Sequence, residues 1–166
     1  KPSSAASDVY KRQAKAVAVE GSTAYVAQGS YGLLVLNTTD PSAIEMLARW
    51  TDNGNVDFND VEKIVVGGTS NPITALLLAN GQYGITVTTL EQDGYVGTAY
   101  RFVNTTGPAL SARAYTGTNS RIYVAEGTSG LDVISMPGLS SMSLAYHYDF
   151  NNFTELQNVI KVQPTT

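Results

Sequence analysis

The sequence predicts an all-β fold in which one unit of four short antiparallel strands is repeated along the chain. Three observations lead to this fold class: a Gly-containing motif that occurs three times, a spacing of about fifty residues between its copies, and segments that lack a helical hydrophobic period. Gly, with 15 residues, and Tyr, with 10, are frequent, as expected for short strands joined by tight turns. The 166 residues suffice for one domain with its own core.

The repeated motif reads Ala-x-Gly-x-x-Gly, then Leu or Ile, then any residue and Val. Its copies are residues 27–35, 79–87 and 125–133, so their first alanines lie 52 and 46 residues apart. The same two offsets relate the aromatic residues Trp50, Phe102 and Tyr148. Each unit therefore keeps its register from the motif to this aromatic residue. The length varies only between the aromatic residue and the next motif.

The first unit contains four runs of strand-forming residues separated by turn signals. The expected strands are residues 15–19, 23–27, 33–37 and 44–50. Gly29 and Gly32 allow the positive φ angles of a hairpin turn between the second and third strands. Asp40-Pro41 marks the next turn, because proline fixes its own φ angle near the value that a turn requires.

The second and third units follow the same plan. The expected strands of the second unit are residues 61–66, 73–78, 84–89 and 96–103, with an enlarged loop over 67–72. Those of the third unit are residues 111–115, 121–125, 131–135 and 143–148. Met136-Pro137-Gly138 is expected to form the last turn of the third unit. Residues 156–162 then predict the first strand of a fourth unit.

Four short strands per unit at this spacing are typical of the blades of a β-propeller. The repeat also resembles the LVIVD-repeat family of bacterial and archaeal surface proteins. The matching segments are residues 24–27 (Ala-Tyr-Val-Ala), 32–37 and 40–41 in the first unit, and 122–125 and 130–134 in the third. The second unit is degenerate, with three leucines at 76–78 in place of the aromatic strand. The resemblance implies a β-propeller and no particular substrate.

The predicted architecture is a partial β-propeller of about three four-stranded antiparallel blades plus the first strand of a fourth. The blades are expected over roughly residues 14–55, 56–107 and 108–152, with the next blade starting within 153–166. Residues 3–13 match a translated sequencing adaptor, so residues 1–13 are expected to be a non-native tail on a piece of a longer propeller. One end face of such a piece is expected to expose apolar residues, namely Val17, Val19, Tyr25 and Val26.

Composition limits the classes of function. The net charge is −4 and only 14% of residues are charged, which argues against a nucleic-acid-binding surface. The sequence has no apolar run long enough to span a membrane, and it has no cysteine for a disulfide or a thiol site. The lack of cysteine fits an extracytoplasmic protein, and we expect a location outside the cell, on its surface or in the periplasm.

Few residues carry chemical signals. Asp52, Asp57 and Asp60 offer oxygen ligands suited to calcium, although their spacing departs from the known calcium loop; the alternative is a polar loop between blades. Tyr31 and Tyr83 occupy the same hairpin position in two units, either as ligand-contacting aromatics or as turn residues that cover their own blade. His147, the single histidine, is interpreted as a packing or surface residue, since partners for a zinc or catalytic site are not evident.

The predicted function is that of a non-enzymatic propeller scaffold that contacts a protein or a glycan, without a catalytic residue or a cofactor beyond the calcium hypothesis. The alternative is a fragment of a propeller enzyme, a hydrolase or lyase, whose catalytic residues lie in further blades. A repeated scaffold does not by itself identify its ligand.

Overall fold

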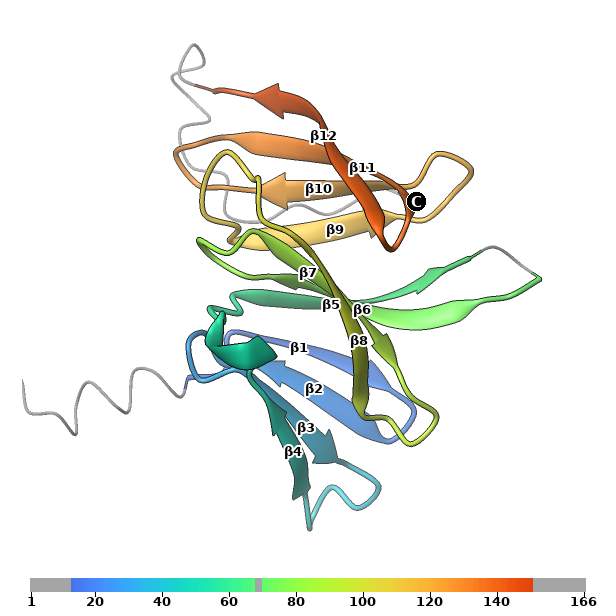
Figure 1. The fold of residues 1–166 in the computed structure, drawn as a ribbon. Helices are drawn as coiled ribbons and strands as arrows, with labels where there is room; N and C mark the ends of the chain where they lie inside the picture. Colours follow the sequence, from blue (N-terminus) through green and yellow to red (C-terminus); the bar gives the residue numbers. More distant parts are fainter. Residues whose placement is uncertain (1–12, 68–69, 151–166) are drawn as a thin grey trace, which may run out of the picture.

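The structure, a computed structural model, describes residues 13–67 and 70–150 (Figure 1). It contains three antiparallel sheets, each built from four strands that are consecutive in sequence. The first sheet contains β1 (Ala16–Glu20), β2 (Thr23–Ala27), β3 (Leu33–Asn37) and β4 (Glu45–Trp50). The second contains β5 (Asp60–Val66), β6 (Ile73–Ala79), β7 (Ile85–Leu90) and β8 (Val96–Phe102). The third contains β9 (Ser111–Tyr115), β10 (Arg121–Ala125), β11 (Leu131–Gly138) and β12 (Ser141–Tyr148).

The sheets lie one after another like propeller blades, and this confirms the predicted fold class (Figure 1). The first strands of successive sheets approach each other, with β5 in contact with both β1 and β9. The fourth strands carry Trp50, Phe102 and Tyr148 at equivalent places, opposite Leu33, Ile85 and Leu131 of the third strands. Helical structure in the described ranges is limited to the short 3₁₀ turn η1 (Asp52–Gly54), and no helix there could cross a membrane.

One predicted turn is wrong. Met136-Pro137-Gly138 forms the end of β11, and the chain turns at Leu139 and Ser140 instead. The strand continues because Met136 is buried in the core and its N–H donates to the carbonyl of Ser120 at 3.0 Å. A register irregularity between β11 and β12 spans Pro137, so the missing N–H of this proline does not interrupt regular pairing.

Two hydrophobic cores fill the spaces between successive sheets. Between the first and second sheets the core contains Tyr25, Leu33, Val35, Phe58, Val61, Leu76 and Leu78. Between the second and third sheets it contains Leu77, Ile85, Val87, Phe102, Ile122, Val124 and Ile134. Alternating β6 side chains enter opposite cores, so the second sheet is covered on both faces. Its strand β6 therefore reads as an almost continuous run of apolar residues.

The expected apolar end face is only partly correct. Val17 and Val19 are 61% and 53% exposed, as predicted. Tyr25 is fully buried instead, and its hydroxyl donates to the carbonyl of Gly94 in the second sheet at 2.8 Å. Val26 is half-buried. Tyr25 lies on the opposite side of the sheet from the exposed valines, because neighbouring strand residues point to opposite faces.

The Ala-x-Gly-x-x-Gly motif forms the same turn in all three sheets. In the first copy the N–H of Gln28 donates to the carbonyl of Gly32, and the N–H of Gly32 donates to the carbonyl of Gly29. Equivalent hydrogen bonds recur at Asn80–Gly84 and at Glu126–Gly130. The first glycine also joins the next sheet: Gly29 exchanges two backbone hydrogen bonds with Phe58, and Gly81 does so with Ala109. The turn thus links adjacent blades.

The last glycine of each motif sets the spacing to the aromatic residue. Gly32, Gly84 and Gly130 have positive φ angles of 103°, 76° and 103°. A Cβ atom at any of them would collide with the backbone carbonyl of Trp50, Phe102 or Tyr148, respectively. Only glycine lets the turn pass this close to the fourth strand. This contact explains why motif and aromatic residue keep the same separation in every unit.

Two predictions concern segments outside the description. The tail assigned to residues 1–13 falls almost wholly on residues 1–12, and the first strand of a fourth blade falls on 153–166; both lie outside the described residues. Gln13 is exposed.

Replacing Gly84 with Ala is expected to destabilise the fold by about 3 kcal/mol or more, because the new methyl group meets both an unfavourable φ angle and a backbone carbonyl. Gly21 is the matched control, since its φ angle is also positive, at 56°, but a Cβ there would meet no atom. G21A should therefore cost only about 1–2 kcal/mol. Urea denaturation of the two variants measures the difference, and equal losses would contradict the proposed role of the carbonyl contact.

Candidate functional site

Each sheet carries a set of three equivalent side chains at the end where the motif turns lie, and we call this set the niche of the sheet. Its three positions are the residue before the first motif glycine, the second residue of the third strand, and the residue before the aromatic position on the fourth strand. The last two are directly paired across the strands. The sets are Gln28, Leu34 and Arg49 in the first sheet; Asn80, Thr86 and Arg101 in the second; and Glu126, Asp132 and His147 in the third.

In the second sheet this niche holds the loop that arrives from the first sheet. Arg101 forms an ion pair with Asp52, which is buried and has a positive φ angle of 42°. The side chain of Asn80 donates to the carbonyl of Asn55 at 2.9 Å and accepts from the N–H of Asp57 at 2.7 Å. The ion pair with Arg101 offsets the backbone strain at Asp52. The niche of the second sheet therefore has a structural role.

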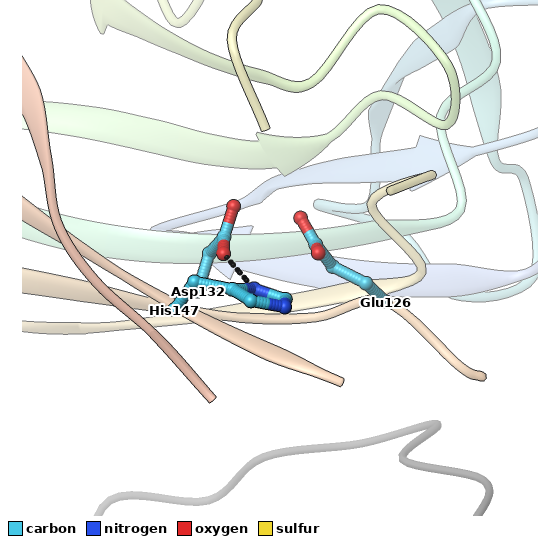
Figure 2. Close-up of side chains that lie close together, drawn as sticks. All are labelled: Glu126, Asp132 and His147. Atoms are coloured by element: carbon cyan, nitrogen blue, oxygen red, sulfur yellow. Dashed lines mark hydrogen bonds and ion pairs between the residues drawn. The ribbon is translucent and has the colours of Figure 1, made fainter. Parts of the chain in front are cut away.

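In the third sheet the niche contains two carboxylates and an imidazole (Figure 2). Asp132 is fully buried and accepts two hydrogen bonds from Thr106, from its N–H at 2.8 Å and from its hydroxyl at 3.1 Å. His147 Nδ1 lies 2.7 Å from Asp132 Oδ1. The side chain of His147 is 27% exposed, so the cluster can be reached from solvent on this side.

Glu126 is the unusual member of the niche. It is 2% exposed, and neither oxygen of its carboxylate has a hydrogen-bond partner among the described residues. Burial, together with the charge and proximity of Asp132, raises the pKa of Glu126 to about 8, and the nearby N–H groups of Gly107 and Thr106 offset this only in part. A buried carboxyl group without partners is costly, so its presence calls for an explanation.

The arrangement can act chemically in two ways. Ligand atoms of Glu126, Asp132 and His147 lie within 4.8 Å of one another, a separation that a single divalent cation could bridge. Alternatively, the hydrogen-bonded pair of His147 and Asp132 could accept and release a proton. The interpretation of His147 as a packing or surface residue did not foresee this cluster. Aligning the three units by register would have placed His147 opposite Asp132, since both belong to the repeated pattern.

The predicted calcium ligands lie in separate environments, each beside a basic group. Asp52 pairs with Arg101, and Asp57 lies 3.5 Å from the ammonium of Lys15. Asp60 accepts hydrogen bonds from Ser111 and from Arg113, the latter at 2.6 Å. The three carboxylates do not form a cluster of the kind found around His147. Calcium binding in this loop stays a prediction.

Tyr31 and Tyr83 occupy the same place in the first and second motif turns, as the sequence alignment of the units requires. The N–H of Tyr31 donates to the carbonyl of Gln28, and that of Tyr83 donates to Asn80. The guanidinium carbon of Arg49 lies 4.4 Å from the ring centre of Tyr31, within the range of a cation–π contact. Both tyrosines are half-buried and lie at the turn end of their sheets, outside the His147 cluster.

Comparison with known families agrees with the architecture of the first sheet. The sequence model of the LVIVD repeat matches residues 11–52, a range that contains β1 to β4. The chain contains an LVIVD repeat. Within this LVIVD repeat lie the first motif turn, Tyr31 and Trp50, while the His147 cluster lies beyond the matched residues. No curated protein and no solved structure matched the chain.

Replacing Glu126 with Gln is expected to remove a pH-dependent loss of stability. In the unfolded chain Glu126 ionises near its ordinary pKa of 4.5, whereas the folded chain holds this proton up to a pKa of about 8. As pH rises through this window the unfolded state binds fewer protons than the folded state. The free energy of unfolding contributed by Glu126 therefore falls. The E126Q side chain is neutral at every pH, so this contribution disappears.

Urea denaturation between about pH 5 and pH 8, in the presence of a chelator, measures this effect. E45Q is the matched control, because Glu45 is exposed on β4. The wild type and E45Q should lose stability along the series more steeply than E126Q. Equal slopes for all three proteins would show that Glu126 ionises normally in the folded state.

Proposed function

We propose that this chain is a non-enzymatic propeller scaffold of the LVIVD-repeat type that binds a protein or a glycan outside the cytoplasm. The observation that carries the proposal is the threefold recurrence of one hydrogen-bonded turn, which presents Tyr31 and Tyr83 at equivalent positions at the same end of successive sheets. A repeat that keeps its turn geometry offers an extended surface with regularly placed side chains.

The turn end has the properties of a preorganised binding surface. Each motif turn is held by three internal backbone hydrogen bonds, and the first two turns are also bonded to the next sheet. Tyrosine contributes a large, rigid and amphipathic contact area with few rotatable bonds. Arg49, packed against the ring of Tyr31, adds a planar group that can donate to carboxylates or hydroxyls. Little conformational entropy is lost when such a surface binds.

The location is proposed from the resemblance of the repeat to surface proteins. LVIVD repeats, one of which matches residues 11–52, are typical of bacterial and archaeal cell-surface proteins, so we place this scaffold on the cell surface or in the extracytoplasmic space.

A propeller enzyme, a hydrolase or lyase, is the second candidate. The pair formed by His147 and Asp132 favours it, because a histidine oriented by a buried carboxylate is a common general base. An enzyme of this kind would lose turnover in H147Q but keep it when the turn tyrosines are replaced. The scaffold predicts the opposite dependence for partner binding.

Replacing both turn tyrosines with serine is expected to weaken partner binding about tenfold or more, since buried interface aromatics often contribute over about 1.4 kcal/mol. The fluorescently labelled chain is first screened on a glycan microarray and against purified cell-surface proteins. Dissociation constants of any ligand found are then compared for the wild type and the double variant Y31S/Y83S.

Y115S is the matched control for this experiment. Tyr115 is 55% exposed but lies at the other end of β9, away from the motif turn that follows β10. Its replacement should leave the affinity unchanged. Binding that survives in Y31S/Y83S and fails in Y115S would place the binding surface at the opposite end of the sheets.

A further inference from the structure

The niche of the third sheet differs from the equivalent niche of the second in a way that the fold does not require. In the second sheet, Asn80 and Arg101 bind the incoming loop, and their polar groups have partners. In the third sheet, Asp132 binds Thr106 of the incoming loop through two hydrogen bonds, while the side-chain oxygens of Glu126 accept none. Glu126 lies near the N–H groups of Gly107 and Thr106, but it forms no hydrogen bond like those that Asn80 forms with the loop of the second sheet.

Glu126 has the geometry of a ligand without its ion. It is 2% exposed, both of its carboxylate oxygens are unpartnered, and its side chain lies beside Asp132 and His147 (Figure 2). An uncompensated buried carboxylate is strongly unfavourable in a protein interior, whereas a cation in contact with both carboxylates would reverse this cost. The lack of hydrogen-bond partners at Glu126 is a separate observation from the closeness of the three side chains, and both observations indicate a bound cation.

We propose that Glu126, Asp132 and His147 form a binding site for one divalent transition-metal ion of the Zn²⁺ class. The donor atoms lie within 4.8 Å of one another. Ligands of a tetrahedral ion with bonds of about 2.0–2.1 Å are separated by about 3.3 Å, so small side-chain rotations complete the site. The metal would take the place of the proton between His147 and Asp132, which are now 2.7 Å apart.

The donor set selects the class of ion. Imidazole nitrogen favours zinc and related transition ions, and carboxylate oxygens also bind them well. Calcium and magnesium prefer sites built from oxygen alone, with six or more ligands for calcium. Asp132 is further oriented by its two hydrogen bonds from Thr106, the kind of outer contact that fixes a ligating carboxylate. The exposed side of His147 provides the route of entry and leaves a coordination position for water.

The experiment is a titration of the tag-free chain, after chelator treatment and dialysis, with ZnCl₂ by isothermal calorimetry. His147 is the only histidine, so a polyhistidine tag must be absent. The expected result is one ion per chain, with an affinity about 100-fold or more weaker in both E126Q and H147Q. Titration with CoCl₂ should give the intense visible absorption of a tetrahedral site in the wild type only. Zn²⁺ should raise the melting temperature of the wild type more than that of either variant.

D57N is the control, because Asp57 is a carboxylate at a different loop, beside Lys15. It should bind zinc as the wild type does. H147Q changes a partly exposed side chain, and E126Q replaces a buried carboxyl group with a neutral amide of nearly the same shape, so neither is expected to unfold the chain; circular dichroism verifies this. Failure of the wild type to bind zinc at millimolar concentration would overturn the proposal. So would unchanged affinity in both variants, and neither result depends on partner binding at Tyr31 and Tyr83.

Discussion

The close contact between the last motif glycine and the outer strand is the constraint on which the repeated architecture depends. Gly32, Gly84 and Gly130 each bring the turn against the carbonyl of the aromatic residue on the fourth strand. This contact sets where the third strand starts relative to the fourth, and so fixes which side chains face each core. A slip of one residue would exchange the buried and exposed faces of the strand, with the loss of the whole packing arrangement.

Adjacent sheets stabilise each other through apolar side-chain contacts and through backbone hydrogen bonds. Trp50 on the first sheet stacks on Phe58, which precedes the second sheet, with ring centres 5.5 Å apart. The backbone pairs Gly29–Phe58 and Gly81–Ala109 add hydrogen bonds between the same neighbours. Apolar burial and backbone pairing thus act at the same boundaries. A sheet in the middle of the series is covered on both faces, and its strands need less polar alternation than those of a sheet with one face in water.

Sequence periodicity predicted the fold well because the motif, the spacing and the aromatic positions all follow from backbone geometry. Most strands lie within one or two residues of their predicted bounds, and the wrong turn at Met136-Pro137-Gly138 arose because turn propensity was outweighed by the burial of Met136. Tyr25 was assigned to the wrong face because alternate residues of a strand point to opposite faces, and the prediction grouped Tyr25 with Val26 although the two are neighbours.

The cluster around His147 was missed because its members are distant in sequence and meet only through strand pairing and a loop that enters from the previous sheet. Asp52, Asp57 and Asp60 are close in sequence, but their side chains diverge toward different basic partners.

The side chains of the niche behind each motif turn can vary without a change in the fold. Its three positions lie where the backbone hydrogen bonds of the sheet are already complete, so the side chains there can change between repeats while the strands keep their register. In one repeat the positions carry Leu34 and Arg49, in the next a loop-binding amide and guanidinium, and in the third two acids and an imidazole. Each copy of the duplicated unit therefore has its own niche, whose side chains can vary independently of those in the other copies. Duplication followed by divergence can therefore equip one copy for a new ligand while its neighbours continue to hold the fold.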